Sequence, residues 1–225
     1  MPWTAPPATT RLTARVLQLL LPLLIIPGFA LAFGLPWQWT ATHWKSPPAI
    51  TLVAREDDPR IPAVREAVEH WNCTFADLPT YFRLGAIIRV DGTLPETDLS
   101  DLSNSNPRGL WIRHHPQPFD SFGGDFIIVL SDGDFVSFTS RIGDRMLVAI
   151  RNGSHPPLSL PNVLHNVIAH EIGHALGLQH NADPTTLMCG RPASCRPNAF
   201  VSDTPRIFPL TTADVGRLHE LYPPP

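Results

Sequence analysis

The strongest constraint on this chain is a set of three histidines between residues 170 and 180, spaced as a helix followed by a turn would space them. His170 and His174 are four residues apart, and residues at that separation share one face of a helix, so both imidazoles can point at one metal ion. Gly177 follows, and glycine adopts a positive φ at little steric cost, which lets the chain leave the helix. His180 can then turn back toward the other two. The spacing predicts three imidazoles that converge on one point.

The residue types match a catalytic metal site better than a structural one. Three protein ligands leave the fourth position of a tetrahedral zinc open for water, whereas four protein ligands would close the site. Glu171 lies beside the first histidine, where its carboxylate can reach a metal-activated water. The alternative is a helix whose histidines only belong to its polar face, and it accounts for neither Gly177 nor His180. We therefore predict one catalytic zinc held by His170, His174 and His180, with Glu171 as the general base.

Apolar patterns elsewhere in the chain indicate both strands and helices. Helices are expected at 61–71, at 160–178 and from a capped start at Thr211-x-x-Asp214 to residue 222. A polar segment rich in Asp, Ser, Asn and Gly, residues 91–109, is expected to be a long loop. Strands are expected at 49–53, 84–90, 110–113, 126–130 and 145–150. The order of these elements predicts an α+β fold in which helices cover a sheet.

The motif His170-Glu171-x-x-His174-x-x-Gly177-x-x-His180 resembles that of the metzincin zinc endopeptidases. Met188 and its context, Pro184–Met188, resemble the Met-turn of the matrixins, the branch that includes the matrix metalloproteinases. Segments 61–71 and 210–222 resemble the first and last matrixin helices. The resemblance implies that Met188 packs beneath the metal without ligating it. It also implies a twisted, mainly parallel sheet with an antiparallel edge strand, packed on helices, one of which carries the motif.

The function that this resemblance implies is zinc-dependent hydrolysis of peptide bonds. Glu171 would take a proton from the metal-activated water and pass it to the leaving amine. An extended peptide substrate would pair with the edge of the sheet, and the matrixin likeness points to Phe126–Leu130 as that edge strand. The alternative is a catalytically silent, membrane-tethered interaction domain that binds zinc on a protease scaffold. It predicts a lost ligand or a lost base, and this chain has all three histidines and Glu171.

An almost wholly apolar run, Val16–Leu35, precedes the predicted domain and is long enough to cross a bilayer as a helix. One interpretation is a cleaved signal peptide with Ala30-Leu31-Ala32 as the cleavage site. The other is an uncleaved signal anchor, which would attach the protein to a membrane through residues 16–35. Arg11 and Arg15 lie just before the run, so both interpretations place the following domain outside the cytoplasm. We predict a signal segment plus linker at 1–48 and a metallopeptidase domain at 49–225.

The charge balance of the predicted domain argues against binding to nucleic acid. The chain has 17 Lys and Arg residues and 20 Asp and Glu residues. Residues 1–45 hold three of the basic residues and no acidic one, so the remainder is net acidic. Nucleic-acid binders instead carry a basic surface that neutralises phosphates.

Several further residues are weaker candidates for a disulfide or for a second metal site. Cys189 and Cys195 could form a disulfide in an oxidising compartment, which would leave Cys73 over, although three free thiols are the alternative. The turn Asp132-Gly133-Asp134 could bind calcium, but its spacing matches no full calcium loop and an ordinary turn is expected. A second, structural zinc has only loose candidates in His114, His115 and His155. His165 is expected to be a packing or surface residue.

Overall fold

The computed structural model describes residues 44–105, 118–190 and 200–224. These residues belong to a compact unit that spans residues 38–225, whereas a separate unit of residues 1–37 lies outside the described part of the chain. Within the described ranges, no helix combines the length and the apolar character that a membrane crossing needs. The predicted signal segment at 16–35 lies outside these ranges, as do the predicted strand at 110–113 and the residues His114, His115 and Cys195.

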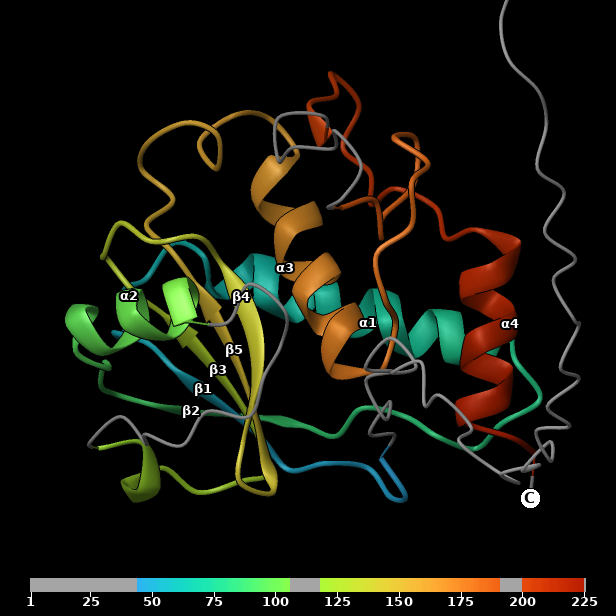
Figure 1. Cartoon of the computed structure of the whole chain (residues 1–225), viewed down its shortest axis with the longest axis horizontal. Coiled ribbons are helices and arrows are strands. Elements are labelled where there is room, and N and C mark those ends of the chain that lie inside the picture. The colour runs from blue at the N-terminus through green and yellow to red at the C-terminus, as the bar shows by residue number, and fades with distance from the viewer. Residues whose placement is uncertain (1–43, 106–117, 191–199, 225) are drawn as a thin grey trace, which may run out of the picture. The chain divides into compact units, whose positions relative to one another are not determined.

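A five-stranded sheet forms the centre of the described unit (Figure 1). Its strands are β1 (Ile50–Val53), β2 (Ile87–Val90), β3 (Phe126–Leu130), β4 (Phe138–Ile142) and β5 (Arg145–Ile150). They lie in the order β2-β1-β3-β5-β4, and every neighbouring pair is parallel except β4 and β5, which are antiparallel. The structure therefore confirms the predicted α+β fold and its mainly parallel sheet with an antiparallel edge strand.

The prediction that Phe126–Leu130 is the edge strand was wrong. This segment is β3, which pairs with β1 on one side and β5 on the other, and all five of its residues are buried. A continuous apolar run is typical of a parallel strand that is covered on both faces, and such strands lie in the interior of a sheet. The antiparallel edge is β4, in which only Ser140 and Ile142 are buried and whose sequence mixes polar and apolar residues.

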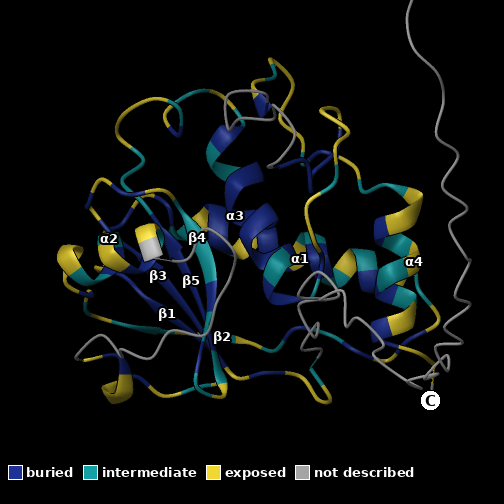
Figure 2. Ribbon diagram, in the orientation of Figure 1, coloured by how far each residue is buried: buried dark blue, intermediate teal, exposed yellow. Residues whose placement is uncertain are grey.

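Helices cover both faces of the sheet, and two separate apolar cores result. On one face the sheet packs against α1 (Ile61–Ala76) and α3 (Val163–Ala175), and α4 (Thr212–Leu221) joins the same core. On the other face lies α2 (Glu96–Ser105), which contributes Leu99 and Leu102 to the second core. In Figure 2 the strands β1, β3 and β5 and the helix α3 are largely buried, whereas α2 and α4 each expose one side. The motif helix α3 is therefore held between the sheet and α1.

The helix α1 forms because its apolar residues recur with helical spacing and because Pro62 suits the first turn. Its buried face includes Val64, Val68 and Trp71, as the sequence predicted, and the helix continues to Ala76 with Phe75 also buried. The indole N–H of Trp71 donates to the carbonyl oxygen of Ala169 at 3.0 Å. This bond ties α1 to the turn of α3 just before His170.

The helix α4 begins as predicted, at a capping box. The Thr211 hydroxyl accepts from the amide of Asp214, and the Asp214 carboxylate accepts from the amide of Thr211, each at 3.0 Å. At the other end of α4, Tyr222 packs on Phe75 of α1 with the ring centroids 5.0 Å apart. The closing helix is thereby fixed against the first.

The prediction of a long loop at 91–109 was wrong, because residues 96–105 form α2. The sequence there is polar, and its helical signal consists of little more than two leucines three residues apart. Leu99 and Leu102 are both buried against the sheet, so tertiary packing supplies the stability that local propensity does not.

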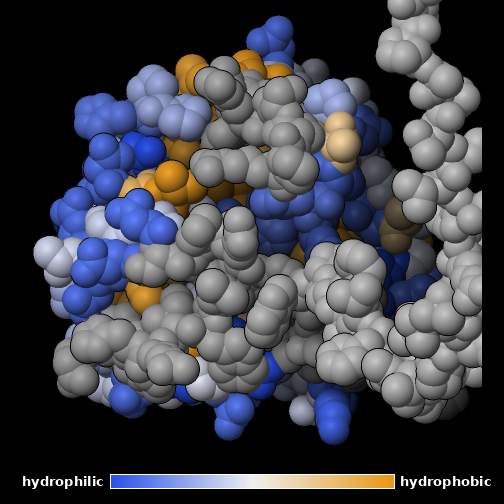
Figure 3. All heavy atoms as spheres, in the orientation of Figure 1, coloured by the Kyte–Doolittle hydropathy of each residue, from blue (hydrophilic) through white to orange (hydrophobic). Residues whose placement is uncertain are grey.

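Hydrophilic residues dominate the described surface in Figure 3, and the large apolar side chains that are exposed within the described ranges are Tyr81, Ile88, Val136 and Val201.

Candidate metal centre

The turn after α3 brings the third histidine back to the first two. The helix ends at Ala175, and Gly177 adopts a φ of +95°, in the left-handed region that glycine occupies without strain. The amide of Leu178 then donates to the carbonyl oxygen of Gly173 at 3.0 Å, which closes the turn. The chain reverses within these residues, and His180 comes to lie beside the helix. Gly177 therefore has the backbone conformation that lets the chain leave the helix.

The Nε2 atoms of the three histidines lie close together around one common point. The distance is 3.1 Å from His174 to His170, 3.2 Å from His170 to His180 and 3.0 Å from His174 to His180. Zinc–nitrogen bonds of about 2.0–2.1 Å in a tetrahedral site separate the ligand nitrogens by about 3.3 Å. The three donor atoms therefore lie about as far apart as a shared zinc ion requires, and these residues form the group in the described chain that could hold a metal.

Hydrogen bonds to backbone carbonyls set the tautomer of two of these rings. Nδ1 of His170 donates to the carbonyl oxygen of Leu187 at 2.7 Å, and Nδ1 of His174 donates to that of Leu178 at 2.9 Å. A carbonyl cannot donate, so in both rings Nδ1 carries the proton and Nε2 presents a lone pair. These lone pairs face one another across about 3 Å, an arrangement that a cation between them would stabilise. The donor set fits a zinc ion with a fourth position left for water.

Burial keeps the helix histidines neutral, which is the form that binds metal. Burial lowers the pKa of His170 from 6.5 to about 4, against the opposing effect of its bond to Leu187. The pKa of His174 also lies well below its ordinary value because of burial and the neighbouring histidines. At neutral pH no proton therefore competes with a metal for these two nitrogens.

Glu171 lies beside His170 on α3 and is buried, with 8% of its surface exposed. Its Oε2 accepts a hydrogen bond of 2.8 Å from the hydroxyl of Thr139 on β4. Burial raises the pKa of the Glu171 carboxyl from 4.5 to about 7, and the bond from Thr139 opposes this rise. Sequence reasoning missed Thr139, and the only signal that could have found it was a polar residue at an alternating position of β4.

Met188 lies directly beneath the motif helix and is fully buried. A β-carbon at Gly173 would lie 2.6 Å from the Met188 sulfur and 3.0 Å from the ring of Trp71. The glycine between His170 and His174 therefore lets α3 approach both side chains closely. Met188 thus packs against the helix between the two histidines, and its place beneath a metal ion stays a prediction.

The segment after His180 pairs with the segment around Met188. The amide of Asn181 donates to the carbonyl oxygen of Met188 at 2.8 Å, and the side chain of Asn181 donates to Asp214 of the α4 capping box at 3.0 Å. Cys189, which follows Met188 in the chain, is buried and takes part in a disulfide, whereas Cys73 is an exposed free thiol. Because Cys195 lies outside the described residues, the pairing of Cys189 with Cys195 stays a prediction.

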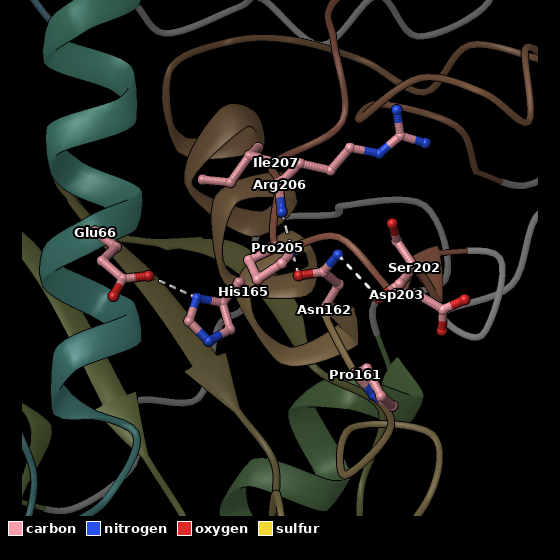
Figure 4. A pocket seen from close by; sticks show the side chains of 9 residues that line it. All are labelled: Glu66, Pro161, Asn162, His165, Ser202, Asp203, Pro205, Arg206 and Ile207. Atoms are coloured by element: carbon pink, nitrogen blue, oxygen red, sulfur yellow. Dashed lines mark hydrogen bonds and ion pairs between the residues drawn. The ribbon is translucent and has the colours of Figure 1, made fainter.

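The remaining candidates lie apart from the histidine cluster. Nδ1 of His165 is 2.7 Å from Oε2 of Glu66 on α1, and both line a surface pocket of about 500 Å³ that none of the motif residues lines (Figure 4). His165 is a surface residue, as the sequence suggested. His155 is exposed.

The carboxylates of the Asp132-Gly133-Asp134 turn each pair with an arginine. Asp132 lies 2.8 Å from Arg55, and Asp134 lies 2.5 Å from Arg151. Each carboxylate of this turn therefore has an arginine as its partner.

Comparisons with known proteins point in the same direction as the geometry. A family model described as Matrixin matches residues 96–223, more than half of the chain, and this range contains the whole motif and Met188. Human matrix metalloproteinase-27 is 45% identical over 56 residues, 25% of this chain and 9% of that protein. Human matrix metalloproteinase-26 is 31% identical over 113 residues, 50% of this chain and 37% of that protein.

Matrix metalloproteinase-A of Caenorhabditis elegans is 33% identical over 82 residues, 36% of this chain and 13% of that protein. The chain therefore spans well under half the length of these three relatives. A solved structure, the archaemetzincin of Methanopyrus kandleri, aligns with a TM-score of 0.43 and 18% identity over 79% of this chain and 96% of that one.

Proposed function

Because this chain belongs to the matrixin family, we propose that it is a zinc-dependent endopeptidase whose metal is held by His170, His174 and His180. The observation that carries the proposal is the convergence of the three Nε2 atoms within 3.2 Å of one another. A zinc ion at this point would supply a Lewis acid that activates water and polarises the scissile carbonyl. Two further features support the proposal, namely the buried Glu171 beside the first histidine and Met188 beneath the helix.

Glu171 is the general base in this proposal. Its Oε2 is held by Thr139, and its Oε1 makes no hydrogen bond to any residue in the described part of the chain, which leaves that oxygen available to water. The carboxylate would accept a proton from the attacking water and then donate it to the departing amine. The rest of the mechanism depends on orientation, because the histidines are fixed by backbone carbonyls and the base by a strand.

The edge strand β4 is the proposed docking edge for an extended peptide. β4 pairs with β5 on one side, and none of the described strands pairs with its other side. The same strand reaches the site, since Thr139 contacts Glu171. A substrate that adds to this edge through backbone hydrogen bonds would therefore pass the base.

Domain organisation and location follow from the sequence and are part of the proposal. Residues 1–48 serve as a signal peptide or signal anchor plus a linker, and residues 49–225 form the metallopeptidase domain. The family match at 96–223 supports the second range, because it lies wholly inside it. The charge-free apolar run at 16–35 after two arginines supports an extracytoplasmic domain with protein or peptide substrates.

The test of this function is chelator-sensitive cleavage of an unfolded protein such as casein by the full chain. Wild type should cleave, should lose activity with a zinc chelator and should regain it when zinc is added back. The variant Glu171→Gln should keep its zinc, because Glu171 is not a ligand, and should cleave about 10²–10⁴ times more slowly, the usual loss when a general base is removed.

The two alternative outcomes are distinct. A Glu171→Gln variant that retains zinc and cleaves as fast as wild type would show that Glu171 is not the base. If wild type holds zinc and yet cleaves nothing across a broad peptide library, the endopeptidase proposal fails and a zinc-binding interaction domain takes its place.

A further inference from the structure

We propose that Thr139 is a positioning residue for Glu171, which fixes the carboxylate from the neighbouring strand so that one oxygen stays free to face water. This inference rests on the endopeptidase function proposed above. It adds a residue outside the motif, on a different element, to the machinery of the site.

The geometry places the Thr139 hydroxyl against two oxygens of the same residue. Oγ1 of Thr139 lies 2.8 Å from Oε2 of Glu171 and 2.7 Å from the backbone carbonyl oxygen of Glu171. A hydroxyl has one hydrogen to donate, and a bond to an ionised carboxylate is stronger than one to a neutral carbonyl, so the carboxylate takes the hydrogen. The carbonyl oxygen of Glu171 lies within hydrogen-bond distance of the same hydroxyl, so Thr139 sits over the turn of α3 that carries Glu171.

The pleat of β4 explains why Thr139 points at α3. Side chains of a strand alternate between its two faces, and Phe138 and Ile142 join the core on the α2 side. Thr139 therefore projects to the opposite face, where α3 lies. The antiparallel register with β5 sets Thr139 opposite Val148, and this register fixes the position along α3 at which the Thr139 side chain contacts the helix.

Burial makes this hydrogen bond important for the orientation of Glu171. An ionised carboxylate that is 8% exposed needs a hydrogen-bond partner, and Thr139 is the one described residue that donates to it. Without the hydroxyl, the carboxylate is free to rotate toward water or toward another donor. Thr139 contacts only one of the two carboxylate oxygens of Glu171, so the other carboxylate oxygen remains available for the reaction.

The position of Thr139 on the edge strand gives the contact a second consequence. The strand that holds Glu171 is also the strand to which an extended peptide would add. Backbone pairing with a peptide would immobilise β4, and through Thr139 it would immobilise the carboxylate. Removal of the hydroxyl should accordingly lower kcat and leave KM nearly unchanged, because the strand keeps its backbone groups.

The experiment compares three variants of the full chain. Thr139→Val replaces the hydroxyl by a methyl of similar size, and Thr139→Ser keeps the hydroxyl. The matched control is Thr51→Val on β1, where the hydroxyl donates to the carbonyl oxygen of Gly123 at 2.7 Å and does not touch the site. For each we would measure zinc content, thermal unfolding, kcat and KM.

We expect Thr139→Val to keep its zinc and to lose about 10-fold to 100-fold in kcat. This range corresponds to the free energy that a hydrogen bond to a charged group typically contributes. Thr139→Ser should restore most of the rate, and Thr51→Val should lower stability without changing kcat. In the Glu171→Gln background, Thr139→Val should cause little further loss, because both changes act on the same group. A kcat for Thr139→Val within twofold of wild type would overturn the inference.

A second measurement does not depend on activity. Crystal structures of zinc-loaded wild type and Thr139→Val should show the Glu171 carboxylate in two different positions, while the three histidines stay in place. An unchanged carboxylate would overturn the inference. If wild type cleaves no peptide, the endopeptidase proposal fails separately, and this structural comparison still decides whether Thr139 positions Glu171.

Discussion

Gly190 lies against the imidazole ring of His180, so closely that a β-carbon at position 190 would overlap Cγ, Cδ2 and Nε2 of that ring. The amide of Gly190 also donates to the carbonyl oxygen of Asn181 at 3.2 Å, which fixes this segment beside the turn that carries His180. Glycine is therefore the residue that lets the backbone after Met188 support the third predicted ligand.

The variant Gly190→Ala should weaken zinc binding, because the added methyl must displace either the backbone or the ring of His180. We expect a loss of about 10-fold to 100-fold in zinc affinity, the range typical of changes that disturb the support of a metal ligand. Competition with a chelator of known affinity measures it. The control is Gly216→Ala in α4, where a β-carbon meets no atom within 4 Å, and that variant should bind zinc as wild type does.

The stoichiometry of the metal is the second prediction. Purified full chain should contain one zinc per molecule, and the replacement of His170, His174 and His180 by alanine should remove it. Metal analysis after dialysis checks both statements. Stoichiometric zinc in the triple variant would place the metal elsewhere.

Acid should destabilise the domain through the buried pair Asp58–Arg60. The Arg60 guanidinium lies 2.6 Å from Asp58 Oδ2, with side chains 6% and 3% exposed. Burial by itself raises the pKa of Asp58, but the hydrogen bonds and the charge of Arg60 outweigh it and hold the pKa below its ordinary value of 3.8. A carboxyl whose pKa is lower in the folded state stabilises the fold above its unfolded pKa, and this stabilisation is lost as pH falls through the folded pKa.

Wild type should therefore lose stability below about pH 4, and Asp58→Asn should show a smaller dependence on pH in that window. At pH 7 the variant should be less stable by about 3–5 kcal/mol, because the buried Arg60 loses its closest charged partner and keeps only the longer ion pair with Asp132, at 3.5 Å. Urea unfolding at a series of pH values measures both effects. The neighbouring variant Asp57→Asn, at a side chain that is 89% exposed, should change little. An equal pH dependence in Asp58→Asn and wild type would contradict the assignment.

A disulfide between Cys189 and Cys195 is the fourth prediction. It would close a short loop after Met188, so its stabilising effect should be at most about 2–3 kcal/mol. Mass spectrometry of a non-reduced digest should recover the two cysteines in one linked peptide and Cys73 as a free thiol. A link that involves Cys73 would show the pairing to be wrong.

The topology of the chain is the fifth prediction. A reporter fused after residue 50 should be active only if it is one that functions outside the cytoplasm, because Arg11 and Arg15 precede the apolar run at 16–35. Activity of a cytoplasmic reporter at the same position would refute the predicted orientation. The size of the mature chain distinguishes cleavage near Ala32 from retention as an anchor.

The parts of the site that the sequence predicted are those that lie within a few residues of one another. The spacing of His170 and His174, the exit at Gly177 and the capping box at Thr211 each depend on helix geometry or on one turn of backbone, and the structure shows all three. The α2 helix was missed because its sequence is polar and its two buried leucines become informative only when a sheet covers them.

The sequence by itself determined that three histidines could converge, because a helix and a glycine turn are local structures whose geometry follows from spacing. Only the tertiary structure decided that β4 is the edge and β3 the centre, since apolar segments do not encode the order in which strands pair. Tertiary packing also placed Thr139 against Glu171, a residue 32 positions away, and Gly190 against His180. Such contacts depend on strand register and on the approach of distant backbones, which no spacing along the chain specifies.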